Sequence, residues 1–130
     1  MRVQNKLGRM LTMFIAPVIN WPVIVIALCF MLLDLVTGFT QACVNHCVDS
    51  KIMKNGLFHK CGFMLAIVFA CLCEYASSYI DMGFTVPVQM AVCSFIIFTE
   101  IVSNLENLGK ISPELAGTKF MDIFRRDDTK

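Results

Sequence analysis

Three long apolar stretches restrict what this chain can fold into. They run from about Asn20 to Val44, from about Cys61 to Ile80 and from about Thr85 to Leu105. Each is close to the roughly 20 residues that an α-helix needs to cross a lipid bilayer. Their apolar residues do not alternate with period two, so a transmembrane β-barrel is excluded. The sequence therefore predicts an all-α membrane protein with three transmembrane helices.

The composition points to lipid as the solvent. Of the 130 residues, 57% are hydrophobic and 16% are charged. A chain this small buries too little of its surface to hide so much apolar area in water. The formal net charge is +1, and no basic cluster is interleaved with aromatic residues. We therefore expect the lipid bilayer as a partner and no nucleic acid.

The seven cysteines do not form a disulfide framework, because their number is odd and most lie in apolar runs. We expect them to act as small hydrophobic residues. A metal site built from Cys43, His46, Cys47, His59 and Cys61 is the alternative, but no Cys-x-x-Cys pair supports it. Catalytic motifs are absent from the sequence as well, so we predict no enzyme, no catalytic residue, no metal and no cofactor.

The chain divides into three segments. Residues 1–19 place apolar residues on one helix face and basic residues on the other, which suits an amphipathic helix at the membrane interface. Residues 20–108 form a three-span transmembrane domain, whose first span we expect to be retained as an anchor rather than cleaved as a signal. Residues 109–130 are expected to form a short C-terminal helix and a charged tail.

The connections between the spans contain turn and cap signals. The first connection, residues 45–60, is basic, and Asn55-Gly56 predicts a turn within it. The second, residues 81–87, contains no Lys or Arg. After the third span, Gly109 predicts a helix C-cap, and Ser112-Pro113-Glu114 predicts the start of a short final helix.

The distribution of Lys and Arg indicates the orientation in the membrane. Three lysines in the first connection and five basic residues in the C-terminal segment lie on one side of a three-span protein. Basic residues favour the cytoplasmic side, so we expect a cytoplasmic C-terminus. Arg2, Lys6 and Arg9 favour the opposite arrangement.

Each predicted span carries a stripe of polar or small residues at helical spacing, starting from a carboxylate. The three carboxylates are Asp34, Glu74 and Glu100. The stripes are Asp34, Thr37, Gly38 and Gln41 in the first span, Glu74, Ser77, Ser78 and Asp81 in the second, and Glu100, Ser103, Asn104 and Asn107 in the third.

The stripes must face protein or water. A charged carboxylate at the bilayer centre costs about 2.5–3.5 kcal/mol on insertion scales, and small residues permit close helix contact. One interpretation is that protomers assemble and the stripes line a wet interior, which is the one that we favour. A second is that they join the three helices of a single bundle. A third is a small transporter or channel subunit that uses the intramembrane carboxylates.

Three segments of the sequence resemble the toxin-secretion/phage-lysis holins, of the phage holin family 4 type. They are LLDLVTG at residues 32–38, DSKIMKNGLFHKCG at residues 49–62 and FTEIVSNLENLGKISPEL at residues 98–115. The last is the most specific, because Glu100, Ser103, Asn107 and the further signature residues hold the family's spacing. Those signature residues are Glu106, Gly109 and Pro113.

The resemblance implies a phage or prophage protein of the bacterial inner membrane. Such proteins form homo-oligomers and open lesions at a set time, through which an endolysin or a toxin escapes as cargo. It also suggests a second start at Met10, since some holin systems use paired starts to make an inhibitor and an effector. Initiation there would remove Arg2, Lys6 and Arg9.

Overall fold

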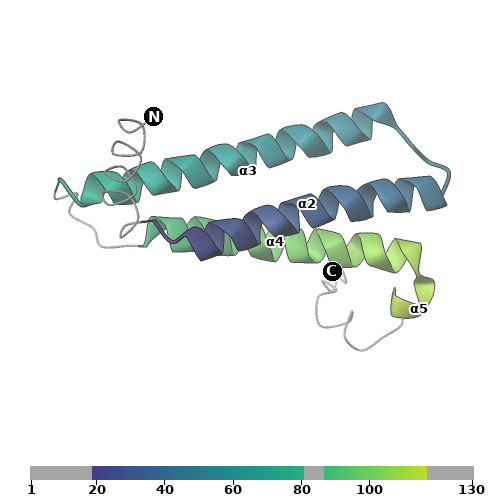
Figure 1. The fold of residues 1–130 in the computed structure, drawn as a ribbon. Helices are drawn as coiled ribbons and strands as arrows, with labels where there is room; N and C mark the ends of the chain where they lie inside the picture. The colour runs from purple at the N-terminus through teal and green to yellow at the C-terminus, as the bar shows by residue number, and fades with distance from the viewer. Residues whose placement is uncertain (1–18, 81–86, 117–130) are drawn as a thin grey trace, which may run out of the picture.

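The computed structural model describes residues 19–80 and 87–116, and within these ranges all regular structure is helical. The elements are α2 (Trp21–Val44), α3 (Ser50–Ser77), α4 (Val88–Ile111) and the short α5 (Pro113–Ala116), shown in Figure 1. The first three are long and apolar enough to cross a membrane, which confirms the predicted all-α architecture. The expected interfacial helix, Asp81 and the charged tail lie outside the described residues.

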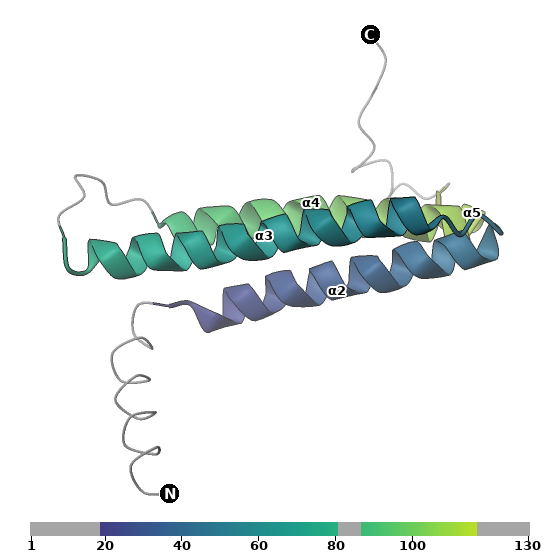
Figure 2. The same cartoon turned by 90° about the horizontal axis from the view of Figure 1, so that it is seen from above.

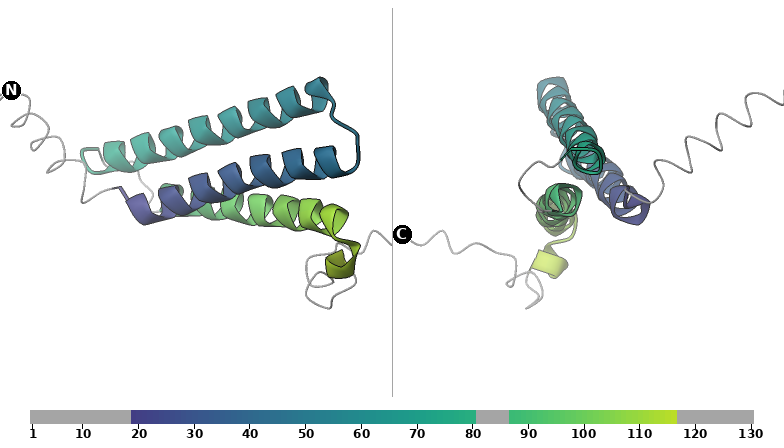
Figure 3. Two further views of the ribbon diagram at one scale, coloured as in Figure 1. Left: turned by 45° about the vertical axis from the view of Figure 1, so that its right-hand side comes forward. Right: turned by 90° about the vertical axis from the view of Figure 1, so that its left-hand side faces the viewer.

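Helices α2 and α4 run in the same direction, and α3 is antiparallel to both (Figures 1 and 2). The most extensive packing is between α2 and α4. Helix α3 packs mainly on α4 and touches α2 little; Figure 3 shows the three helices in two further views. Helix α4 therefore holds the bundle together.

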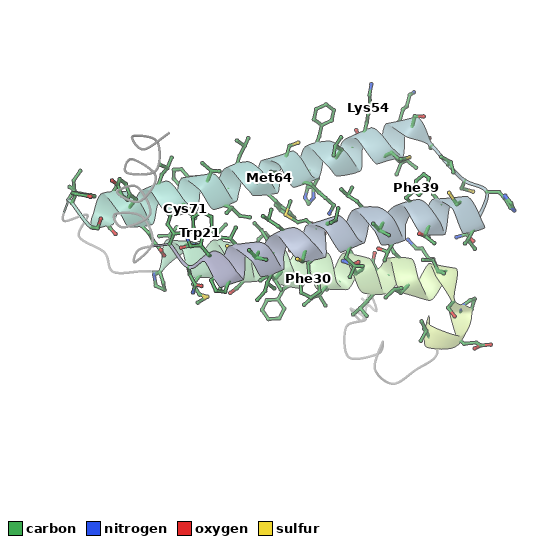
Figure 4. The ribbon with its side chains drawn as sticks, in the orientation of Figure 1. Trp21, Phe30, Phe39, Lys54, Met64 and Cys71 are labelled. Atoms are coloured by element: carbon green, nitrogen blue, oxygen red, sulfur yellow. The ribbon has the colours of Figure 1, made fainter. Side chains whose placement is uncertain are left out.

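A thin apolar core lies between the helices, and the outer faces are apolar too. The core consists of Ile24, Ala27, Met31, Ile67, Cys93 and Ile96. Large hydrophobic side chains such as Phe58 and Leu65 are about 70% exposed, as the stick view in Figure 4 illustrates for the outer surfaces. Exposed apolar surface on all three helices is expected for a protein whose solvent is lipid.

Aromatic side chains lie at the end of the bundle where α2 begins and α3 ends. Trp21 is the first residue of α2, and Tyr79 follows the end of α3. Both side chains are more than half exposed. Tyr75 donates a hydrogen bond to Tyr79 over 3.4 Å. Trp and Tyr are enriched at membrane–water boundaries, so this end of the bundle fits the edge of the bilayer.

Helix α3 begins eleven residues before the predicted start of the second span, at Ser50 rather than Cys61. The expected turn at Asn55-Gly56 is therefore wrong, because both residues lie inside the helix. The side chain of Asp49 accepts a hydrogen bond from the backbone of Lys51 at 2.7 Å and caps the helix. Asn and Gly weaken a helix only modestly, so this cap and the packing of later turns outweigh them.

The third span ends later than predicted. Gly109 is not a C-cap, because α4 continues through it to Ile111 and ends at Ser112, whose backbone is extended. Pro113 explains the position of the end, since the residue before a proline is driven out of the helical region. Pro113 then begins α5 with Glu114 in its first turn, as the sequence predicts.

Candidate functional site

The polar stripes of α2 and α4 face each other within one protomer. The Thr37 hydroxyl is a hydrogen-bond donor to Oδ1 of Asn104, 3.1 Å away. The Asn107 amide donates to Oδ1 of Asp34 at 3.0 Å and to the Thr37 hydroxyl at 3.3 Å. Gly38 allows this approach, because a Cβ there would already stand 3.5 Å from the Asn107 amide nitrogen. An added methyl group would be in ordinary van der Waals contact with Asn107, and a longer side chain would have to displace the Asn107 amide.

Asn104 ties the two helices together through their backbones. Its side chain is 4% exposed. Its amide nitrogen donates to the carbonyl oxygen of Glu100, one turn earlier, at 2.7 Å, and to the carbonyl oxygen of Phe30 on α2 at 3.3 Å. A buried amide is costly unless its donors and acceptor are satisfied, and here each has a protein partner.

Lys60 reaches this interface from α3 and contacts two carboxylates. Its ammonium nitrogen lies 2.9 Å from Oδ2 of Asp34. It also lies 2.6 and 2.7 Å from the two oxygens of Glu100. The side chains of Lys60 and Glu100 are 7% and 2% exposed, so the pair is removed from the surrounding medium. We call Asp34, Lys60 and Glu100 the ion cluster; it joins all three transmembrane helices.

The ion cluster has an excess of negative charge. One ammonium faces two carboxylates, so the cluster carries one net negative charge when all three groups are ionised. The Asn107 amide offsets part of it by donating to the oxygen of Asp34 that Lys60 does not contact. Breaking such a pair by removal of one partner is strongly destabilising, because it leaves a buried charge without compensation.

A second polar site lies at the opposite end of α3 and joins three helix ends. One oxygen of Glu74 accepts a hydrogen bond from the backbone of Gln89, in the first turn of α4, at 3.0 Å. The Gln89 side chain, 1% exposed, accepts from the backbone nitrogen of Asn20 and donates to its carbonyl oxygen. A carboxylate at a helix N-terminus is favourable, because the unpaired backbone N–H groups donate hydrogen bonds to it and the positive end of the helix dipole attracts its charge.

The remaining predicted residues within residues 19–80 and 87–116 do not join these contacts. Ser77 and Ser78 are exposed and donate to carbonyl oxygens of their own helix. Gln41 and Ser103 are half-buried, and helical spacing places them next to the residues through which α2 and α4 bond to each other. Of the family-signature residues, Glu106 and Pro113 are exposed and Gly109 is half-buried. The three predicted stripes are therefore not equivalent: those of α2 and α4 meet, and of the α3 stripe residues that the structure describes, Glu74 is the one whose side chain bonds to another helix.

The sequence prediction missed two residues that the structure places in these sites, Lys60 and Gln89. The sequence places Lys60 among the basic residues of the first connection; this prediction is wrong, because Lys60 lies buried in α3. A signal was present: Lys60, Ile67 and Glu74 follow one another at steps of seven residues and so share a helix face. Nothing in the local sequence marks Gln89 as a residue that contacts Asn20.

An open groove of about 170 Å³ lies beside the ion cluster between α2 and α3. Its walls are apolar apart from Lys60 and consist of Leu28, Met31, Leu32, Leu35, Leu57, Lys60, Cys61 and Met64. Helices α2 and α3, which form its walls, share little packing with each other.

The alternative metal site gains no support from the parts of the chain that the structure describes. Within residues 19–80 and 87–116 no group of three His, Cys, Asp or Glu side chains is placed to hold a metal ion. Cys43, Cys47 and Cys61 are exposed free thiols, and His46 lies in the connection after α2 with a positive φ of 53°.

Comparison with known proteins gives one match. A protein-family model described as the bacteriophage holin family matches residues 10–121, which covers all of the helices described above. No curated protein and no solved structure matches the chain. The match includes both polar sites and both connections between the transmembrane helices.

Proposed function

This chain belongs to the bacteriophage holin family, and we propose that it oligomerises in the bacterial inner membrane to open a pore or lesion that releases an endolysin or a toxin. The chain is a holin-like, multi-pass membrane protein.

The observation that carries the proposal is the buried polar network across all three membrane helices. A protein that served only as an anchor would have no use for one ammonium, two carboxylates and two amides that bond to one another within its spans. Ionisable residues within membrane spans are costly and usually mark a pathway for water, ions or solutes. In an assembly, the same groups can line a wet interior while the apolar outer faces remain in lipid.

Within a single protomer the network acts as the glue that the bundle interpretation describes. The single-bundle and wet-interior interpretations describe two successive stages. The network first stabilises each protomer while it accumulates in the membrane, and it turns toward water when protomers assemble. Asp34 and Glu100 would hydrate the interior, whereas Glu74 would keep holding α3 to the start of α4.

A small transporter is the second candidate. The ion cluster beside an apolar groove is the type of arrangement in which transporters bind substrates or protons. This candidate predicts pH-dependent movement of a solute without loss of cell viability, whereas the holin proposal predicts abrupt and lethal permeabilisation.

The orientation that we propose keeps the C-terminus in the cytoplasm. Lys60 no longer counts toward the charge of the first connection, because it is buried against two carboxylates. Lys51 and Lys54 remain exposed at the start of α3, on the same side as exposed Lys110 near the end of α4. These lysines still favour the cytoplasmic side for that end of the bundle.

The test is inducible expression in bacteria with two readouts, a dye that reports the membrane potential and a nucleic-acid dye that intact membranes exclude. We expect a delay followed by abrupt loss of potential and entry of the dye. Glu100→Gln should alter both, whereas Glu114→Gln, an exposed change on α5, should alter neither. Slow growth with an intact potential at equal membrane levels would contradict the proposal.

A further inference from the structure

Lys60 is the one residue of α3, among those described, whose side chain bonds to the polar groups shared by α2 and α4. We propose that Lys60 is a latch that holds α3 closed on the protomer and sets the delay before permeabilisation. The latch is the contact of its ammonium with Asp34 on α2 and Glu100 on α4. This inference rests on the proposed function, because it describes how the same polar network is kept from water.

Of the three long helices, α3 packs least on the others. It contacts α2 little, and the groove beside Lys60 lies between these two helices. Residues 51–59, the turns between the start of α3 and Lys60, are all exposed. Figure 4 shows Lys54 in this segment pointing away from the other helices. Helices α2 and α4, in contrast, are joined by the Thr37–Asn104 and Asp34–Asn107 hydrogen bonds.

The two ends of α3 are held differently. At its C-terminal end, Glu74 bonds to the backbone of Gln89 and so ties α3 to the start of α4. On the N-terminal side of Lys60 no described residue of α3 is buried. Release of Lys60 would therefore let α3 swing away at the end near the first connection while Glu74 keeps its other end in place.

The polar side chains that are buried in the closed protomer are satisfied by other groups of the same protomer. Within the described residues, no buried side-chain nitrogen or oxygen atom lacks a hydrogen-bond partner. Movement of α3 would uncover Asp34 and Glu100, two carboxylates that are costly against lipid and stable against water. Opening is therefore unfavourable for a protomer surrounded by lipid and becomes favourable when several protomers enclose a wet space.

The test compares Lys60→Met with Lys54→Met, two identical changes on the same helix. Met keeps most of the length of the lysine side chain and removes the charge. Because Lys60→Met leaves two buried carboxylates without their cation, we expect the loss of membrane potential to begin earlier after induction, by roughly twofold or more at equal membrane protein levels. Lys54 is exposed and has no such partner, so Lys54→Met should leave the delay unchanged.

A charge exchange separates the latch from a general loss of stability. The double variant Lys60→Glu with Glu100→Lys places the ammonium on α4 and keeps it beside two carboxylates. Each single variant should shorten the delay or reduce the protein level, and the double variant should restore the delay toward that of the wild type. Immunoblotting of the membrane fraction would provide the protein levels for the comparison.

The outcomes distinguish the latch from the proposed function. Abrupt permeabilisation by the wild type together with an unchanged or longer delay for Lys60→Met would overturn the latch and leave the proposed function standing. A charge exchange that accumulates normally but restores nothing would also overturn it. If neither Lys60→Met nor the exchange accumulates, the cluster serves folding alone and the latch is wrong. A wild type that never permeabilises the membrane would overturn both.

Discussion

Replacement of Thr37 by Val tests whether the polar contacts between α2 and α4 stabilise the protomer. The substitution preserves the shape of the side chain and removes its hydroxyl. That hydroxyl is 3.1 Å from Oδ1 of Asn104 and accepts a hydrogen bond from Asn107 at 3.3 Å. It also lies 3.3 Å from the carbonyl oxygen of Asp34 in its own helix, and its single proton serves one acceptor at a time.

The expected loss follows from the number of contacts between helices. Hydrogen bonds between membrane helices average about 0.6 kcal/mol in double-mutant cycles, so the two contacts together contribute roughly 1 kcal/mol. The Asn104 oxygen then lacks this donor in a buried position, which raises the expected cost to about 1–3 kcal/mol. We therefore expect Thr37→Val to lower the free energy of unfolding by an amount within this range.

Thr40→Val is the matched control, because it is the same change one turn later on the same helix. The Thr40 hydroxyl is exposed and donates only to the carbonyl oxygen of Val36 in its own helix, at 2.8 Å. The measurement is reversible unfolding of the purified protein in mixed micelles, followed by circular dichroism. Equal effects of the two substitutions would refute the reasoning, because only Thr37 bonds to another helix.

Two further predictions concern the second polar site and the close approach of the helices. Glu74→Ala should lower the free energy of unfolding by about 0.5–2 kcal/mol and speed amide exchange in the first turn of α4, because it removes the acceptor for the Gln89 backbone; unchanged exchange there would count against it. Gly38→Leu should weaken the bundle by about 1–3 kcal/mol, since a longer side chain at this position must displace Asn107. Gly62→Leu, where an added Cβ meets nothing within 4 Å, should have no such cost in the same unfolding assay.

The number and helical nature of the spans could be predicted because they depend on local properties. Length and hydrophobicity define a membrane helix, and the periodicity of Asp34, Thr37, Asn104 and Asn107 indicates a buried face. The start of α5 also follows from a local signal, the proline at position 113. Two of the three predicted stripes do face each other, as their spacing suggests.

The beginning of α3 could not be predicted in this way. Lys60 is charged and follows Asn55-Gly56, so its surroundings in the sequence are typical of a loop. What buries it is a pair of carboxylates on two other helices, 26 and 40 positions away along the chain. Such a partner is invisible to any window of neighbouring residues. Two intramembrane carboxylates without a cation were nevertheless a reason to search for one on the third helix.

The most direct test of the account is whether the polar face between α2 and α4 meets water when the membrane is permeabilised. In a variant without the seven native cysteines, Ser103→Cys reports on the border of this face, and Phe98→Cys reports on the exposed apolar face of the same helix. A membrane-impermeant thiol reagent would be added before and after the loss of potential. We expect position 103 to be labelled only after the loss of potential and position 98 to stay unlabelled throughout. Permeabilised cells in which position 103 remains unlabelled, or in which both positions react alike, would contradict it.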